Sequence, residues 1–333
     1  MLNKILYVLS AGFFASIIYK NYPLLYTIPE NLLKANLFLI LIALFIQVIK
    51  HLALSYNFYL NFKKSGVSFS FSEVVKATFV YIYVCVSTPF VGAGGLLAFI
   101  HFAGHKNESK IKVGSGAFLA LLGDYLGFFL LIVLSVIFYR SSVEDFPLNY
   151  IFALLIFGAT LLTIVFLSIF MKNFLTALLK LLQNTANFLT NLTHKKIYFD
   201  EKWAARNVEL AHECFVGIRK DPKFYLKIIL LGLCIHLLNM ASFYIIGLSF
   251  KENLSSSKVV SSYIVLNTLE TVSPTPNGIG IIESFVPEYM SRIGINFSTS
   301  FVLVTFFRFI YFYIPLFIGF YLSYKIFNHK ENS

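Results

Sequence analysis

The chain has 333 residues, of which 58% are hydrophobic, 18% aromatic and only 13% charged. Water-soluble domains carry about 25% charged residues, so this composition excludes a soluble protein and predicts one that lives in a bilayer. Lysine and arginine outnumber aspartate and glutamate by 27 to 16, an excess typical of cytoplasmic loops beside anionic lipids. Three scattered cysteines without a CxxC spacing exclude a disulfide scaffold and a zinc site.

Six apolar stretches are predicted to cross the bilayer, where a helix needs about 20 residues, or fewer when neighbouring helices shield it. They are residues 5–19, 35–49 with an extension to 54, 111–139, 150–171, 224–250 and 299–324. The first stretch follows Lys4, and no small-x-small cleavage site comes after it. We therefore expect an uncleaved helix there rather than a signal peptide.

Two further apolar stretches are each interrupted near the middle by proline and glycine. Residues 74–87 are followed by TPFVGAGG at 88–95 and a helix to 103, and residues 259–272 by SPTPNGIG at 273–280 and a helix to 290. An arm of about 14 residues rises roughly 21 Å, which passes the bilayer midplane without crossing the membrane. Because proline removes a helix donor and glycine loosens the backbone, we expect broken or re-entrant hairpins at 74–103 and 259–290.

The two breaks resemble each other, which predicts an inverted repeat. If both stretches are hairpins and the N-terminus is inside, 20 basic residues, Lys50 among them, lie on the cytoplasmic side and six lie outside. If both stretches span instead, the bias falls to 16 against ten. We therefore expect cytoplasmic termini, with the first hairpin entering from the cytoplasm and the second from outside.

The chain divides into a first transmembrane half at 1–171, a linker at 172–222 and a second half at 223–333. In the linker, leucines recur near helical spacing from Phe174 to Leu192, which predicts an amphipathic helix on the membrane surface. A second, polar helix is expected at 200–219. The linker is predicted to be cytoplasmic because it is rich in lysine and arginine.

Charged side chains inside predicted spans need a reason, because each costs about 2.5 to 3.5 kcal/mol at the bilayer centre. The candidates are Asp124, Glu270, Glu283 and Arg308. Asp124 could equally pair locally within the bundle. His236 is more simply a neutral histidine packed against Asn239 than a proton carrier.

Both breaks offer a way to bind an anion. The helix after each break begins near the midplane with unpaired N–H groups and about half a positive charge, which attracts phosphate. Arg308 could add a bidentate phosphate contact, while Glu283 could be the counterion of Arg308 or take part in proton coupling. The predicted substrate-binding residues are Pro89, Gly92, Gly94, Gly95, Asp124, Glu270, Pro274, Pro276, Asn277, Gly278, Gly280, Glu283 and Arg308.

The sequence SPTPNGIGIIE at 273–283, together with Phe307-Arg308-Phe309, Pro315 and Gly319, resembles the transmembrane region of lysylphosphatidylglycerol synthases, a family of flippase-like integral membrane proteins. The resemblance extends over nearly the whole chain, although Asn277 stands where the family usually has glycine. It implies lipid translocation between the leaflets of the bacterial cytoplasmic membrane. In fused members a separate soluble domain performs aminoacyl transfer, and we expect this chain to be a stand-alone member without it.

The leading hypothesis is a flippase or transporter for an anionic or modified phospholipid or a lipid-linked headgroup. No nucleophile motif is present, and the seven histidines are dispersed, so catalysis is the weaker hypothesis and no metal or cofactor is expected. One alternative is an intramembrane transferase with Asp124, Glu270 or Glu283 as base. Another is a membrane partner of a soluble synthase or transferase, which the basic stretch 172–227 would contact. Membrane lipids are expected partners, and nucleic acid is not.

Overall fold

The computed structural model describes residues 35–87, 93–106, 108–139, 171–192, 202–252, 254–273 and 275–328, with scattered positions between 156 and 170. All regular elements in these ranges are helical, which confirms the predicted all-α polytopic membrane protein. Four of them are long and apolar enough to span a bilayer: α3 (Leu37–Lys64), α6 (Lys110–Tyr139), α10 (Pro222–Ser249) and the segment Phe297–Lys325. The other helices are α4 (Phe71–Ser87), α5 (Ala93–His105), α8 (Lys172–Leu192), α9 (Trp203–Lys220), α11 (Ser256–Val272) and α12 (Ile281–Arg292), with the short turn η2 (Pro276–Gly278).

Four of the six predicted spans therefore correspond to helices of spanning length. The predicted span at 5–19 lies outside the described residues, and so does most of the span at 150–171. The total of six stays a prediction.

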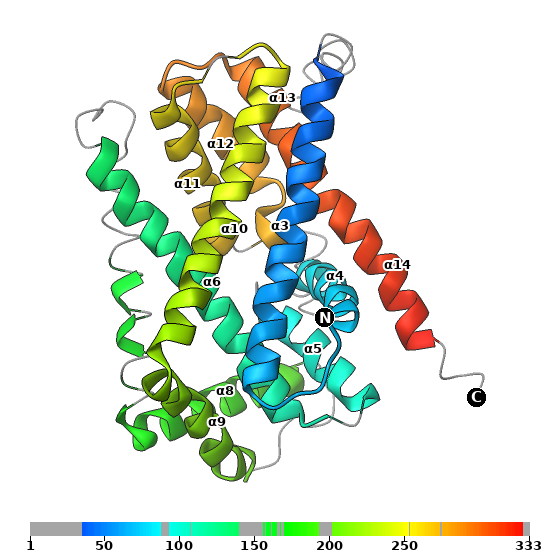
Figure 1. Ribbon diagram of the computed structural model, residues 1–333, viewed down its shortest axis with the longest axis vertical. Coiled ribbons are helices and arrows are strands. Elements are labelled where there is room, and N and C mark those ends of the chain that lie inside the picture. The colour runs from blue at the N-terminus through cyan, green and yellow to red at the C-terminus, as the bar shows by residue number, and fades with distance from the viewer. Residues whose placement is uncertain are drawn as a thin grey trace.

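Helices α3 and α10 form an antiparallel pair on the face of the molecule toward the viewer in Figure 1 and run side by side along its height. At one end the Asn36 N–H donates to the Ser249 carbonyl at 2.9 Å, and at the other Lys64 Nζ lies 2.5 Å from Asp221 Oδ2. The Asp221 carboxylate also caps α10 by accepting the Phe224 N–H at 3.2 Å. The hydrogen bonds from Lys64 and from this amide hold the pKa of Asp221 below its usual value, so the ion pair at this end is charged at neutral pH.

Helix α3 extends ten residues beyond its predicted end at 54 and stops at Lys64. Residues 55–64 contain no proline or glycine, and the first left-handed residue is Gly66, with φ of 73°. Lys50 therefore lies in the middle of a 28-residue helix and is only 8% exposed. The prediction that Lys50 lies at the cytoplasmic end of a span was wrong, because its side chain is buried inside the protein.

The first predicted hairpin is the pair α4 and α5, which pack against each other in the lower half of Figure 1. A Cβ at Gly95 would lie 2.3 Å from the Tyr81 ring and 2.4 Å from Cys85 Sγ, so a glycine is needed where the arms touch. At the base of the pair, Lys106 Nζ lies 2.6 Å from Glu73 Oε1. The hydrogen bond from this ammonium lowers the pKa of Glu73 to about 2, so the Glu73 carboxylate is ionised and the ion pair is present at neutral pH.

The second predicted hairpin is the pair α11 and α12, joined through η2 and placed at the opposite end of the molecule from α5 (Figure 1). The turn η2 contacts α4, so the tip of the second hairpin reaches an arm of the first. The tip of the first hairpin, residues 88–92, lies outside the described residues. In the described part of the chain the two helix pairs therefore point toward each other from opposite ends.

The last span is not one continuous α-helix, as was predicted for 299–324. It consists of α13 (Phe297–Arg308), a π-helical turn η3 (Phe309–Tyr313) and α14 (Ile314–Asn328), and the Ile314 N–H donates to the Phe309 carbonyl five residues back. Pro315 explains the change, because it has no N–H to donate and its ring clashes with the preceding turn. The π-turn widens the helix next to Arg308.

Helices α6 and α10 cross at contact distance between glycines. A Cβ at Gly127 would lie 2.3 Å from the Leu233 nitrogen, and one at Gly232 would lie 2.5 Å from the Gly123 carbonyl oxygen. Gly123 and Gly127 have the GxxxG spacing that lets two membrane helices approach closely. The crossing fixes which residues of α6 and α10 face each other.

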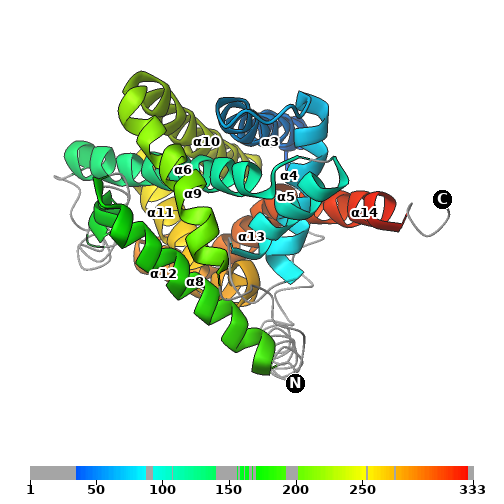
Figure 2. The ribbon, with the colours of Figure 1, turned by 90° about the horizontal axis from the view of Figure 1, so that it is seen from below.

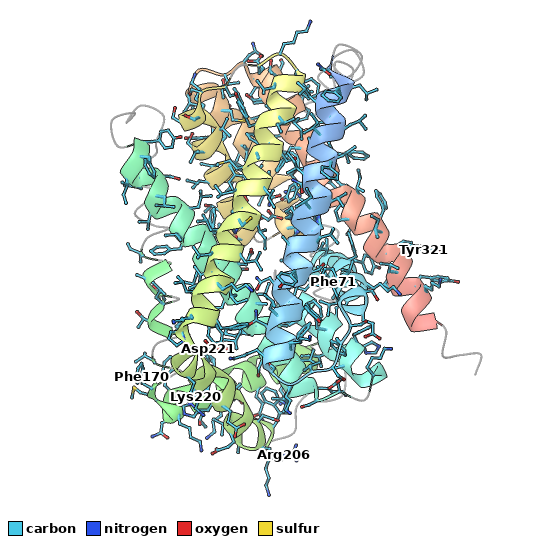
Figure 3. All side chains as sticks on the ribbon, viewed as in Figure 1. Phe71, Phe170, Arg206, Lys220, Asp221 and Tyr321 are labelled. Carbon is cyan, nitrogen blue, oxygen red and sulfur yellow. The ribbon has the colours of Figure 1, made fainter. Side chains whose placement is uncertain are left out.

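Helices α8 and α9 lie together across one end of the molecule (Figure 2). Arg206, Lys220 and Asp221 gather at this end (Figure 3), and an ion pair between Lys172 and Glu209 holds α8 to α9. The Lys172 ammonium keeps the pKa of Glu209 below its usual value. The two linker helices thus exist at 172–192 and 203–220, close to their predicted ranges, and their cytoplasmic placement stays a prediction.

We expect Gly127→Ala to destabilise the protein by about 1 to 3 kcal/mol, because the added methyl group meets backbone atoms of α10 that cannot move aside. The control is Gly114→Ala in the same helix, where the nearest atom would be Ile100 Cδ1 at 3.5 Å. There we expect no loss, since alanine also has the higher helix propensity. Thermal unfolding in detergent measures both, and equal stability of the two variants would contradict the close crossing.

The opposed hairpins predict opposite accessibility for Lys110→Cys, after the first pair, and Ser291→Cys, at the end of the second, each in a chain with the native cysteines replaced. Both side chains are exposed. Lys110 is the first residue of α6, directly after α5, and Ser291 lies in the last turn of α12, and the pairs α4–α5 and α11–α12 lie at opposite ends of the molecule (Figure 1). In intact cells a membrane-impermeant maleimide should label Ser291→Cys and should reach Lys110→Cys only after permeabilisation. Labelling of both from the same side would contradict the inverted arrangement.

Candidate functional site

Arg308, the last residue of α13, has no exposed surface. Its Nε lies 3.0 Å from Glu283 Oε1, its Nη1 donates to the Asn277 carbonyl at 3.0 Å, and its guanidinium lies 4.8 Å from the centre of the Phe312 ring. Its Nη2 has no hydrogen-bond partner among the residues that the structure describes. The guanidinium therefore joins the last span to the tip of the second hairpin and keeps one donor unused.

The tip of the second hairpin turns through left-handed backbone. The φ angles are 48° at Asn277, 67° at Gly278 and 84° at Gly280. Glycine adopts this region freely and asparagine more readily than most residues, which accounts for these residue types. At Gly278 a Cβ would also lie 2.6 Å from Ile282 Cδ1. The turn begins with Pro276 in η2 and leads into the first residue of α12.

Glu283 occupies the start of α12. Its Oε2 accepts the Gly280 N–H at 2.8 Å, while its Oε1 faces Arg308. A carboxylate at this place is favoured by the helix dipole. Of the two roles considered from the sequence, these distances support that of counterion to Arg308. The Glu283 carboxylate also accepts the Gly280 N–H, which is one of the N–H groups expected from the sequence to bind a phosphate.

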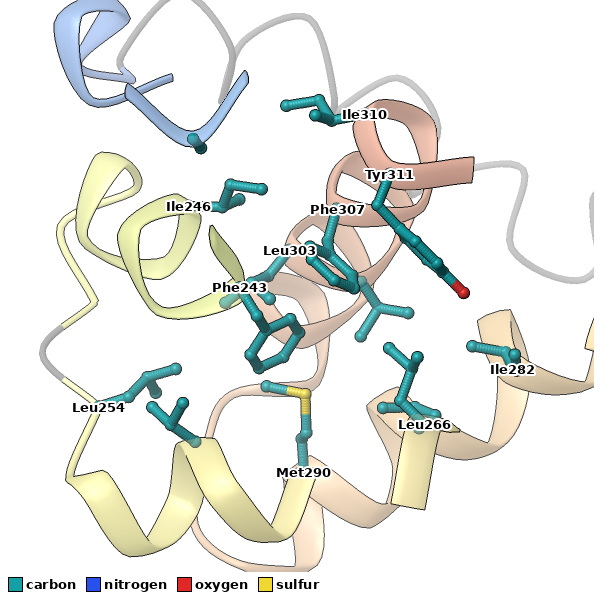
Figure 4. Packing of buried hydrophobic residues seen from close by; sticks show 14 of the residues in the cluster. Phe243, Ile246, Leu254, Leu266, Ile282, Met290, Leu303, Phe307, Ile310 and Tyr311 are labelled. Atoms are coloured by element: carbon teal, nitrogen blue, oxygen red, sulfur yellow. The ribbon is translucent and has the colours of Figure 1, made fainter. Parts of the chain in front are cut away.

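Glu270, in the last turn of α11, accepts two hydrogen bonds. Tyr311 Oη donates to Oε2 at 2.6 Å and Asn277 Nδ2 donates to Oε1 at 3.3 Å. The Tyr311 ring stacks on Phe307 with centroids 4.6 Å apart, and Figure 4 shows both rings projecting from the last span toward α11 and α12. Lys50 Nζ, from α3, lies 5.6 Å from the centre of the Tyr311 ring. This site thus draws on α3, α11, α12 and the last span.

A second group of polar side chains lies between α3, α6, α10 and α11. Asp124 Oδ1 is 3.7 Å from His236 Nε2, and His236 Nδ1 is 2.8 Å from Tyr263 Oη. The Asn239 side chain takes part in two hydrogen bonds: its Nδ2 donates to Tyr263 Oη at 3.4 Å, and its Oδ1 accepts from Gln47 Nε2 at 3.1 Å. His236 is thus buried near Asn239, as expected, but it meets Asp124 and Tyr263 directly.

Lys50 links the two groups, because it interacts electrostatically with both Glu270 and Asp124. Glu270 in turn interacts with Arg308 and with Asp124. We call the set Lys50, Asp124, Glu270, Glu283 and Arg308 the charged cluster. In the described ranges no three His, Cys, Asp or Glu side chains converge as metal ligands.

Some of the other predicted site residues lie in the described part of the chain and some do not. Pro89, Gly92 and Pro274 lie outside the described residues, and Gly94 is the second residue of α5. Gly95 packs against α4 and allows the two arms to touch, so its glycine is explained without the approach of a headgroup.

Sequence reasoning missed Lys50, Tyr311 and Tyr263. Lys50 and His51 stand between Ile49 and Leu52 in a stretch without proline or glycine, and the length of this stretch could have shown Lys50 to be interior. Nothing in the sequence marks the two tyrosines among the 20 of this chain.

A family model described as the lysylphosphatidylglycerol synthase TM region matches residues 8–319. The match covers nearly the whole chain, both helix pairs and all five residues of the charged cluster. It confirms the resemblance seen in the SPTPNGIGIIE segment. A comparison with curated proteins finds no match.

We expect Glu283→Gln to destabilise the protein by about 3 to 5 kcal/mol, because it leaves the enclosed Arg308 without its counterion. The matched control is Glu288→Gln in the same helix, whose exposed pair with Arg292 contributes roughly 0.3 to 0.5 kcal/mol. Chemical or thermal unfolding in detergent measures both.

The double variant Glu283→Leu/Arg308→Met should recover most of the stability, since an apolar pair of similar volume replaces the ion pair without an uncompensated charge. A stability of Glu283→Gln equal to that of Glu288→Gln would contradict the counterion role.

Proposed function

The chain belongs to the lysylphosphatidylglycerol synthase transmembrane-region family, and on that premise we propose that it is a flippase that moves an anionic phospholipid or a lipid-linked anionic headgroup between leaflets. The family ties this helical membrane protein to lipid handling. Substrate and direction of movement belong to the proposal.

The observation that carries the proposal is the charged cluster, whose five residues come from α3, α6, the second hairpin and the last span. Each charge inside a membrane protein has a high desolvation cost, and charges retained there commonly mark a substrate or ion pathway. Transporters built from inverted repeats bind their substrates near the midplane, at the repeat interface between interrupted helices. The interrupted helices α11 and α12 and the contact between η2 and α4 support this role.

Two donors would hold the phosphate. Arg308 Nη2 has no partner in the described residues, and the Lys50 ammonium rests above the Tyr311 ring. Arg308 is enclosed, so a headgroup reaches it only when the second hairpin moves away from the last span. In this proposal the Arg308–Glu283 ion pair closes the empty site, and the arriving phosphate competes with Glu283 for the guanidinium.

We also propose the bacterial cytoplasmic membrane as the location, with both termini in the cytoplasm. The lysine and arginine bias supports this orientation. The basic linker helices α8 and α9 would then face the cytoplasm, where a soluble synthase or transferase could bind. This linker is the proposed place for such a partner.

The test uses the full chain in vesicles that carry headgroup-labelled phosphatidylglycerol, lysylphosphatidylglycerol or phosphatidylcholine, with a quencher that reaches only the outer leaflet. We expect the protein to speed movement of phosphatidylglycerol. Tyr311→Phe should slow it by about tenfold, because it removes a hydrogen bond to the Glu270 carboxylate worth roughly 1.5 kcal/mol.

Tyr321→Phe is the matched control, because this tyrosine lies on the outer side of α14 and is exposed (Figure 3). It should move lipid at the rate of the unmodified protein. Folded protein that accelerates none of the three lipids would refute the proposed function. Movement of lysylphosphatidylglycerol alone would reassign the substrate to an aminoacylated lipid.

A further inference from the structure

The charged cluster has an excess of negative charge. It contains two cations, Lys50 and Arg308, and three carboxylates, Asp124, Glu270 and Glu283, which interact electrostatically across α3, α6, α11, α12 and α13. With His236 neutral, the formal charge of the cluster is therefore minus one. A phosphate that enters it makes the charge minus two, inside a protein interior where uncompensated charge is costly.

One proton taken up together with the anion would restore the charge. Two of the carboxylates already have partners on both oxygens: Glu270 accepts hydrogen bonds from Tyr311 and Asn277, while Glu283 accepts one from the Gly280 N–H and forms an ion pair with Arg308 through its Oε1. Glu270 is stabilised as an anion by its two hydrogen bonds, and Glu283 by one hydrogen bond and by the positive charge of Arg308. The proton is therefore expected at Asp124, the third carboxylate.

Asp124 and His236 face each other through atoms that lack hydrogen bonds. Asp124 Oδ1 and His236 Nε2 are both buried, 3.7 Å apart, and without a hydrogen-bond partner among the described residues. A shift of less than 1 Å would close this distance to a hydrogen bond of about 2.8 Å once a proton lies between the two groups. The Asp124 side chain is 22% exposed, so the protein does not enclose it completely.

The groups around His236 come from three other helices. Asp124 faces it from α6, Lys50 interacts with it from α3, and Tyr263 is hydrogen-bonded to its Nδ1 from α11. Whichever partner donates in the Tyr263 contact, Nε2 is the ring nitrogen that faces Asp124. Lys50 connects this place to the site at Glu270 and Arg308, which are the groups that would sense an arriving anion.

We propose that the Asp124–His236 pair is a proton-binding site, and that one proton binds there when an anionic phosphate headgroup enters the charged cluster. The proposal rests on the proposed function for the presence of the headgroup, and it adds the coupling ion. Proton binding and lipid binding then strengthen each other by the same factor. Affinity for the anionic lipid should rise as the pH falls, by up to about tenfold per pH unit when one proton is taken up.

The experiment adds short-chain phosphatidylglycerol to the purified full chain in weakly buffered detergent solution, with a pH-indicator dye and a parallel binding titration between pH 6 and about pH 8, a range that spans the unperturbed histidine value. We expect uptake of about one proton per bound lipid and a matching pH dependence of the affinity. Zwitterionic phosphatidylcholine, which brings no net charge, should cause no uptake.

Asp124→Asn removes the excess negative charge, so the lipid should bind with no proton uptake and with an affinity that does not change with pH. His236→Gln should also abolish the uptake and weaken binding at low pH. The matched control, Asp221→Asn, lies at the exposed start of α10 and should keep the uptake and pH dependence of the unmodified protein.

Binding of phosphatidylglycerol without proton uptake would overturn this inference and leave the proposed function standing. Uptake that persists in Asp124→Asn and His236→Gln would place the proton elsewhere and overturn the assignment to this pair. Lipid binding with proton uptake, but with no movement in the vesicle assay, would support the site and refute the flippase. Folded protein that binds no phosphatidylglycerol at any pH would overturn the inference.

Discussion

The arrangement of the second hairpin depends on one constraint: the buried guanidinium of Arg308 needs a counterion and hydrogen-bond acceptors. A buried charge must be paired and hydrogen-bonded, and here a carboxylate from α12 and a backbone carbonyl from η2 meet it. The left-handed residues Asn277, Gly278 and Gly280 allow the chain to double back there, so that both ligands come from one short turn. The π-helical turn that starts at Phe309 then places Tyr311 against Glu270. Removing the arginine would leave this tip without its main contact to the last span.

A second constraint comes from the absence of side chains at the crossing of α6 and α10. Gly127 and Gly232 bring the two backbones together, and Asp124 and His236 are carried on the same two stretches. The contact between these titratable groups is therefore a consequence of packing. A similar close approach at Gly319, where a Cβ would lie 2.1 Å from the Phe79 carbonyl oxygen, holds α14 against α4. Small residues thus determine where the charged side chains lie.

Together these constraints suggest how a lipid headgroup and a proton could share one site. The charged cluster draws on α3, α6, the second helix pair and the last span, and its charges do not cancel. In the proposed cycle, the Arg308–Glu283 ion pair closes the empty site, and Asp124, whose Oδ1 has no hydrogen-bond partner among the described residues, takes up the proton. An intramembrane transferase would also use buried carboxylates, but both oxygens of Glu270 accept hydrogen bonds from the protein, and Glu283 is held by one hydrogen bond and by its ion pair with Arg308.

The sequence by itself determined the membrane class, four of the helices that can span a bilayer, the two interrupted stretches, and Asp124, Glu270, Glu283 and Arg308 as charges in need of partners. It did so because the effects of proline and glycine on the backbone are local, and because the cost of placing apolar or charged residues in water or lipid does not depend on which residues surround them. It misplaced Lys50, missed the π-turn and could not identify the partners of these charges. Only the tertiary structure decided that Arg308 meets Glu283 and Asn277, that Tyr311 meets Glu270, and that Asp124 faces His236. Those contacts join residues from 25 to 112 positions apart, and their distances depend on how glycines let the helices cross, which no local pattern records.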